Sequence, residues 1–107
     1  MTPSRSKSTA LVILDLGTFD VHLNGGRRML HMELSIEVDA PDFSDLEHLR
    51  QAVMTVAGNH TYDDLNSIDG RLRLRDEIRD ALNDLAATSL RRNDVVQRVY
   101  FTDFVVL

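Results

Sequence analysis

The chain has 107 residues, of which 43% are apolar, as expected of one globular domain with a single core. Twelve Lys and Arg residues against 17 Asp and Glu residues give a formal charge of −5, which disfavours nucleic acids and anionic membrane surfaces as partners. The sequence has no cysteine, which excludes disulfides, Cys-based zinc sites and thiol catalysis, and its longest apolar run is far shorter than the roughly 20 residues of a membrane span.

The first nine residues are small, polar and slightly basic. This composition is typical of a disordered terminus or an expression remnant. We therefore predict that residues 10–107 form the folded domain.

The first predicted strand changes the phase of its apolar alternation partway along. From Ala10 to Leu14 the even positions are apolar, whereas from Phe19 to Leu23 the odd positions are, and Gly17 lies between the two halves. A one-residue slip beside a glycine is typical of a β-bulge, because the extra residue returns the apolar side chains to one face. Two short strands joined by a kink are the alternative.

The second predicted strand, Met29 to Val38, alternates apolar and polar residues over its whole length. One face therefore belongs to the core and the other, with His31 and Glu33, to water. Asn-Gly-Gly at positions 24–26 favours a tight hairpin, so the first two strands are predicted to be antiparallel.

Two helices follow. Ser44 to Gly58 has a capping-box pattern and apolar residues at helical spacing, and Ser67 to Ala87 has an aliphatic stripe with a charged outer face. Between them, Thr61 and Asp64 form a cap pair for a single turn.

The last predicted strand, Val96 to Leu107, has apolar residues at both parities, so both of its faces are predicted to be apolar. The start of the first strand has the same property. Because the two helices can cover only one face of a small sheet, the excess apolar surface predicts a protein interface, with a loop folded over the back as the alternative. Asp103 is costly to bury without a partner and must reach water, an arginine or another subunit. The predicted interface residues are Leu11, Ile13, Tyr100, Asp103, Phe104 and Val106.

Pairs of arginines occupy two predicted loops: Arg27 and Arg28 follow the hairpin turn, and Arg91 and Arg92 precede the last strand. These four residues are predicted to contact a partner at the rim of the domain. The four histidines have no metal-ligand spacing, and neither a phosphate-binding loop nor a nucleophile elbow is present in the sequence. We therefore predict no catalytic, cofactor-binding or metal-binding residue.

The predicted fold is α+β, with a small antiparallel or mixed sheet, the order β-β-α-α-β and two helices packed on one face. Four segments of the sequence then resemble, in order, those of the flagellar basal-body-associated FliL family. These segments are "LGTFDVHL" at 16–23, "TYDDLNSIDGRLRLRDEI" at 61–78, "ALNDL" at 81–85 and "VQRVYFTDFVVL" at 96–107.

The resemblance implies a non-enzymatic accessory protein of the bacterial flagellar motor. FliL proteins have one transmembrane helix and a periplasmic domain similar to the stomatin/prohibitin (SPFH) fold, and they are implied to form rings around the MotA/MotB stator that support torque generation and motility. This chain resembles the periplasmic domain, so the resemblance places it on the periplasmic face of the inner membrane at the basal body. Its membrane attachment would be an anchor outside this chain, and Ala10 to Leu14 would lie nearest the membrane.

Two other functions remain as alternatives. The domain could bind a small ligand, or act as an enzyme, in a pocket between helices and sheet, which would require convergent polar groups lining a cavity. It could also be a soluble regulator that forms homo-oligomers through its apolar strands.

Overall fold

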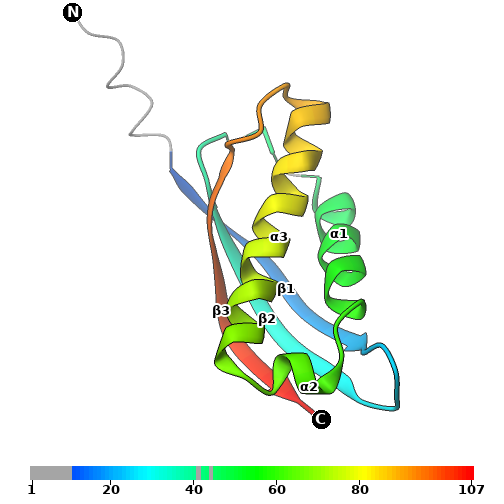
Figure 1. Ribbon diagram of the computed structural model, residues 1–107. Coiled ribbons are helices and arrows are strands. Elements are labelled where there is room, and N and C mark those ends of the chain that lie inside the picture. Colours follow the sequence, from blue (N-terminus) through cyan, green and yellow to red (C-terminus); the bar gives the residue numbers. More distant parts are fainter. Residues whose placement is uncertain (1–10, 41, 44) are drawn as a thin grey trace, which may run out of the picture.

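Along the chain, two strands are followed by a helical segment and a last strand. The computed structural model describes residues 11–40, 42–43 and 45–107. Its elements are β1 (Val12–His22), β2 (Met29–Val38), α1 (Leu46–Gly58), α2 (Tyr62–Leu65), α3 (Ile68–Ser89) and β3 (Val96–Val106) (Figure 1). The α+β class is confirmed, and the turn predicted at Thr61 is the four-residue helix α2.

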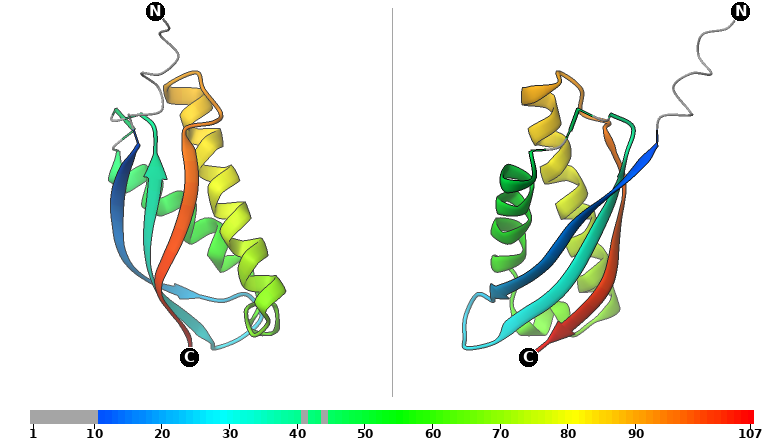
Figure 2. Two further views of the ribbon diagram at one scale, coloured as in Figure 1. Left: turned by 90° about the vertical axis from the view of Figure 1, so that its left-hand side faces the viewer. Right: turned by 180° about the vertical axis from the view of Figure 1, so that it is seen from behind.

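Within the described residues the sheet has three strands in the order β1-β2-β3, and both pairings are antiparallel. The central strand is therefore β2, while β1 and β3 are edges. Helices α1 and α3 cover one face of this sheet, and α2 lies at the end near the β1–β2 hairpin (Figures 1 and 2). The opposite face carries no helix of the described chain (Figure 2).

The core lies between β2 and the helix pair. The alternate residues of β2 that face the helices are fully buried, as the period-two pattern predicts, and they are Leu30, Met32, Leu34, Ile36 and Val38. Buried aliphatic residues of α1 and α3 pack on them from the other layer, among them Leu49, Val53, Leu74, Ile78 and Leu82. Burial of this apolar area is the main stabilising contribution to the fold.

The predicted bulge in β1 is confirmed. The register against β2 shifts between Asp15 and Gly17, and Gly17 has a φ of 85°, a conformation that glycine adopts without a Cβ penalty. The Asp15 carboxylate accepts a hydrogen bond from the Gly17 N–H at 2.8 Å. After the bulge, Phe19 and Val21 face the core.

The prediction that both faces of the last strand are apolar is wrong. The register of β3 against β2 shifts twice, at Thr102 and at Gln97. Each extra residue reverses which of the following β3 side chains point toward the helices. As a result, the β3 residues that pair with the five buried β2 residues are all apolar: Val96, Val99, Phe101, Phe104 and Val106. The outer face of β3 is mixed and carries Arg98, Tyr100, Asp103 and Val105.

Side-chain caps begin each helix. Thr61 and Asp64 form the predicted capping box of α2, and the Ser67 hydroxyl caps α3 by accepting from the Gly70 N–H. The N-cap of α1 is Asp45, one residue after the predicted Ser44, which lies outside the described residues, as does the predicted terminus 1–9 together with Ala10.

Candidate interaction surface

The predicted interface residues of β1 are strongly exposed. Leu11 and Ile13 have 49% and 56% of their surface accessible, and Val12 between them is exposed as well. Ile13 pairs with Glu37 and therefore lies on the open face of the sheet. The start of β1 is thus a contiguous apolar segment at the edge of the molecule, and such segments are typical of interaction sites.

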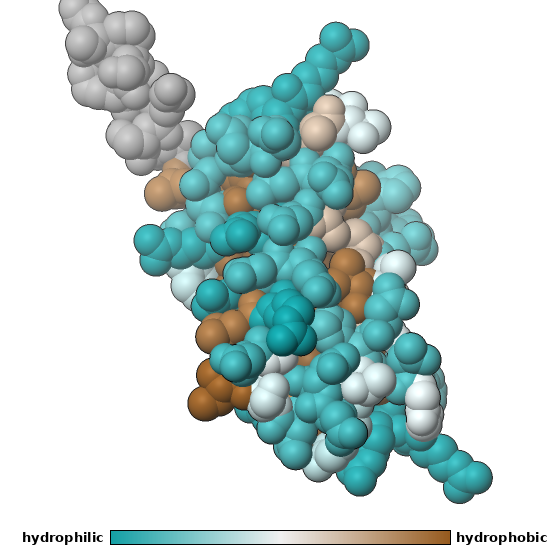
Figure 3. All heavy atoms as spheres, in the orientation of Figure 1, coloured by the Kyte–Doolittle hydropathy of each residue, from teal (hydrophilic) through white to brown (hydrophobic). Residues whose placement is uncertain are grey.

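The predicted interface residues of β3 divide between the two faces. Tyr100 and Asp103 lie on the open face, opposite Ser35 and Glu33 of β2. Phe104 and Val106 instead face the helices and are half-buried against the core. Figure 3 shows a largely hydrophilic helix side, with apolar atoms gathered at the left-hand edge, along which β3 runs.

A polar row crosses the open face from edge to edge. His31, on the central strand, lies 2.7 Å from the Asp20 carboxylate of β1 through Nδ1 and 3.5 Å from the Asp103 carboxylate of β3 through Nε2. The hydrogen bond to Asp20 raises the pKa of His31 above its usual value, and the charges of Asp20 and Asp103 act in the same direction. Asp103 therefore reaches water, the first of its three predicted alternatives, and its neighbour is His31 and not an arginine.

The remaining charges of this face are mostly acidic. Glu33 accepts a hydrogen bond from the Thr102 hydroxyl at 3.2 Å, and Glu37 lies 3.7 Å from Arg98. The open face is therefore wet and negatively charged along its middle, while its exposed apolar residues lie toward the margins.

The β1 edge is partly closed by a side chain of α1. Arg50 donates hydrogen bonds to the carbonyl oxygens of Leu16 and Thr18, the latter at 2.8 Å, and its guanidinium stacks on the Phe19 ring at 4.1 Å. These contacts occupy the bulged middle of the edge. The segment before it, from Leu11 to Asp15, is not covered by these contacts and can present its backbone to a partner.

The four predicted rim arginines lie at opposite ends of the molecule. Arg27 and Arg28 belong to the β1–β2 hairpin, and the Arg28 guanidinium stacks on the Tyr62 ring of α2 at 4.1 Å. Arg91 and Arg92 lie in the link between α3 and β3, near the start of β1 (Figure 1). The structure thus does not bring the four residues together.

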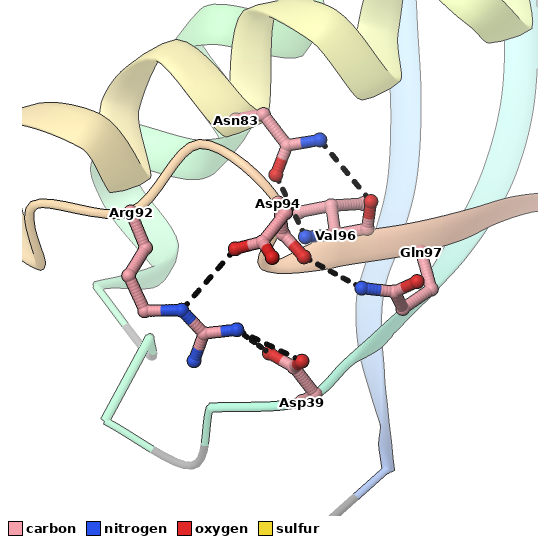
Figure 4. Close-up of polar contacts among 6 residues, drawn as sticks. All are labelled: Asp39, Asn83, Arg92, Asp94, Val96 and Gln97. Atoms are coloured by element: carbon pink, nitrogen blue, oxygen red, sulfur yellow. Dashed lines mark hydrogen bonds and ion pairs between the residues drawn. The ribbon is translucent and has the colours of Figure 1, made fainter. Parts of the chain in front are cut away.

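Arg92 has a structural role in addition to any contact with a partner. It lies 2.9 Å from the Asp39 carboxylate at the end of β2 and 3.2 Å from Asp94 (Figure 4). These contacts raise the pKa of Arg92 further above its usual value. Beside it, Asn83 of α3 accepts from the Val96 N–H and donates to the Val96 carbonyl oxygen, which fixes the first residue of β3 (Figure 4).

The described residues contain no group of three or more His, Asp or Glu side chains placed to hold a metal ion. His60 is buried and bonded through Nε2 to Glu77 at 2.7 Å, an arrangement that joins the loop before α2 to α3. A groove of about 480 Å³ runs between the start of α1 and the end of α3, over the apolar side chains of Phe43, Leu49 and Leu85. Its charged residues Asp42, Asp45 and His48 are exposed, and Asp45 is engaged in capping α1.

A family model supplies the identification. The model of the flagellar basal body-associated protein FliL matches residues 13–106, which span every strand and helix from β1 to β3. The chain belongs to the FliL family. A search of curated proteins returned no match.

The family match ties this fold to the flagellar basal body, which is the coarser part of the location that the sequence resemblance implied. The match begins at Ile13, so of the predicted interface residues only Leu11 lies outside it. No helix in the described ranges combines the length and the apolar character needed to cross a membrane. The FliL fold of this chain is thus an accessory element of the flagellar motor, built around a sheet with one open face.

Proposed function

We propose that this chain is the periplasmic domain of a non-enzymatic motor accessory protein, which assembles into a ring around the MotA/MotB stator and supports torque generation and motility. The observation that carries the proposal is the family match along the whole fold, combined with an exposed apolar segment at the start of β1. A fold relationship to the SPFH domains of stomatin and prohibitin is part of the same proposal.

Self-association would use the open margins of the sheet. Leu11 and Ile13 at the start of β1, with Tyr100 and Asp103 on the open face of β3, supply exposed apolar and polar groups at two different edges. Two different surfaces that contact each other head to tail form a ring when the rotation between copies closes. Phe104 and Val106 contribute less, because they face the helices.

Such a ring acts by equilibrium binding and needs no catalytic group. A scaffold that binds the engaged conformation of a stator more tightly than the idle one shifts the stator population toward engagement. The domain would lie on the periplasmic face of the inner membrane, joined to its anchor through the segment before Leu11. Arg91 and Arg92, at the same end of the molecule, would then lie nearest the membrane, and Arg27 and Arg28 farthest from it.

The test measures self-association and stator binding with purified protein. Sedimentation velocity over a wide concentration range is expected to show assembly, and the chain is expected to retain the periplasmic part of MotB in a pull-down. The variant Ile13→Asp should weaken assembly at least about tenfold, because it places a charge in an apolar contact.

A matched control comes from α3. Ile68 is more exposed than Ile13, at 76%, but it belongs to the first turn of α3 and not to the proposed contact residues of the sheet, so Ile68→Asp should leave assembly unchanged. A chain that stays monomeric at high concentration and does not retain MotB contradicts the proposal. Equal effects of the two variants would contradict the assignment of the β1 segment as the interface.

A further inference from the structure

One side of α3 runs along the edge strand β3. Side chains four residues apart share a helix face, and Arg71, Arg75, Arg79 and Asn83 form such a row. Both ends of the row contact β3: Arg71 lies 4.9 Å from the centroid of the Phe104 ring, and Asn83 makes two hydrogen bonds with Val96 (Figure 4). The two middle members, Arg75 and Arg79, therefore lie over the middle of β3.

A groove separates these two arginines from the strand. It has a volume of about 360 Å³, and its lining includes Arg98 from the outer face of β3. Three guanidinium groups from two elements thus border one groove, together with a single carboxylate, that of Asp76. Positive charge is therefore in excess within the lining itself, while the carboxylates of Asp80 and Glu37 lie beside the groove and pair with Arg79 and Arg98.

The three guanidinium groups are not engaged in hydrogen bonds to any residue that the structure describes. Arg75 lies 3.6 Å from the Asp76 carboxylate, and Arg98 lies 3.7 Å from that of Glu37. Arg79 lies 3.9 Å from the Asp76 carboxylate and 3.6 Å from that of Asp80. These distances exceed those of charge-assisted hydrogen bonds, and all three side chains are at least 42% exposed. Arg50 and Arg92, by contrast, donate hydrogen bonds within the fold.

The strand beside the groove is an open edge. β3 pairs only with β2 among the described strands, so every other backbone N–H and C=O of its central part points away from the sheet. An extended peptide can pair with such an edge and place alternate side chains over the neighbouring helix. Unpaired backbone groups beside arginines whose ion pairs are long and exposed favour a polypeptide that is extended and acidic.

We propose that the groove lined by Arg75, Arg79 and Arg98 binds an acidic, extended segment of a partner protein, which adds to β3 as a fourth strand. The guanidinium groups would hold its carboxylates by paired hydrogen bonds, while the backbone of β3 aligns the segment. This goes beyond the ring, since the occupant is another protein, and it would share Tyr100 of the groove lining with the ring contact proposed above. The free part of the β1 edge, from Leu11 to Asp15, is a poor match for the groove because it carries one carboxylate.

The probe is a fluorescein-labelled octapeptide of alternating Glu and Val, with blocked ends. Fluorescence anisotropy at low salt is expected to show saturable binding that weakens as salt rises. The same peptide with Lys in place of Glu should not bind. Two further versions of the peptide carry N-methyl groups on alternate amides, so that each version blocks the backbone donors along one edge of the extended peptide. If the peptide adds as a strand, only the version blocked on the edge that pairs with β3 should lose binding.

Variants assign the site. Arg75→Gln combined with Arg79→Gln should weaken binding at least about tenfold, since it removes two charge-assisted contacts. The matched control is Arg73→Gln, an exposed arginine of the same helix that does not line the groove. Amide spectra of the labelled protein should shift at Val99 and Phe101, and a far-ultraviolet spectrum confirms that each variant is folded.

Four results would overturn the proposal. Equal loss in the double variant and in Arg73→Gln would mean general charge attraction, and equal binding of the two N-methylated peptides would mean that no strand is added. If inorganic polyphosphate binds the groove and the acidic peptide does not, the site is one for phosphate. A self-association that the double variant abolishes, without peptide binding, would assign the groove to a second copy of the chain.

Discussion

His31 connects the three strands of the open face through its two ring nitrogens. Asp20 and Asp103 approach it from opposite edge strands, and Glu33 on its own strand adds to the negative potential around it. An imidazolium satisfies both carboxylates at once, whereas a neutral imidazole can donate to only one of them. The charge on this one residue therefore affects how the two edges are held to the centre.

The stability of the domain should decrease with pH as His31 loses its proton. The folded-state pKa of His31 is raised above the value of about 6.5 for a free histidine. A raised pKa contributes stability in full below the unfolded-state value, and that contribution is lost as the pH rises through the folded-state value. Urea unfolding should show a larger difference between the native chain and His31→Gln at pH 5.5 than at pH 8.5.

The control for this experiment is His22→Gln. His22 is an exposed histidine at the end of β1 and pairs with Met29, so this variant controls for the removal of an imidazole from the surface of the sheet. A proton titration of the His31 ring by NMR gives the pKa directly. A midpoint at or below that of a free histidine would contradict the assigned role of Asp20.

Gly70 lies where the end of α2 approaches α3 closely. A Cβ at this position would overlap the carbonyl oxygen of Asp64, at the end of α2. Gly70→Ala should therefore force α2 away from α3 and destabilise the fold by about 2 kcal/mol or more, measured by urea unfolding. Gly26→Ala in the hairpin, where a Cβ would have no neighbour within 4 Å, should cost much less.

The edge strand β1 is protected along its middle by a helix. Arg50 uses its guanidinium on the carbonyl oxygens of Leu16 and Thr18, and Gly17 makes room for it, since a Cβ there would lie 3.2 Å from the Arg50 Nη1. Bulges and side-chain covers of this kind prevent edge-to-edge association. The fold therefore closes the bulged middle of β1 and leaves its first part open to a partner.

Arg50→Ala should uncover the middle of this edge. We expect a loss of about 1–2 kcal/mol of stability from the stacking on Phe19 and the two hydrogen bonds, together with new association that does not depend on Ile13. Light scattering of Arg50→Ala and of the double variant Arg50→Ala/Ile13→Asp measures this. Arg50→Lys, which keeps the charge but not the fork geometry, separates charge from shape.

The two bulged edge strands differ in how readily their sequences reveal the bulge. In β1 the change of phase coincides with Gly17, so the slip could be predicted. In β3 the slips occur at Thr102 and Gln97, which need no special backbone conformation and carry no sequence signal except the change of parity itself. Phe104 and Val106 were therefore predicted on the wrong face.

The partner of Asp103 could not be predicted for the same reason. Its position opposite Glu33, and so beside His31, depends on the register after Thr102. The helices, the hairpin and the core strand were predictable because each follows from a local periodicity or a cap. Contacts between distant strands require the register, which local patterns do not fix.

At the scale of the whole molecule, stability is concentrated in the centre. β2 is buried against both helices and paired on both sides, whereas β1 and β3 each have one free edge. Amide hydrogen exchange should therefore be slowest at Leu34 and Ile36, where exchange requires global unfolding, and fast at Ile13. If the start of β1 is the interface, exchange at Ile13 should slow as the protein concentration rises, while exchange at the exposed Leu72 of α3 should not change.

The bulge at Thr102 also affects how members of this family are compared. An extra residue in an edge strand can be gained or lost by a single-codon insertion or deletion, because the central strand does not need to change. Two relatives that differ in this way can be aligned residue by residue up to that position. Beyond it, residues in the same alignment column would point to opposite faces of the sheet. Positions of β3 in two relatives should therefore be matched by the β2 residue that each one pairs with. In a relative, the counterpart of Asp103 is the residue that pairs with the equivalent of Glu33.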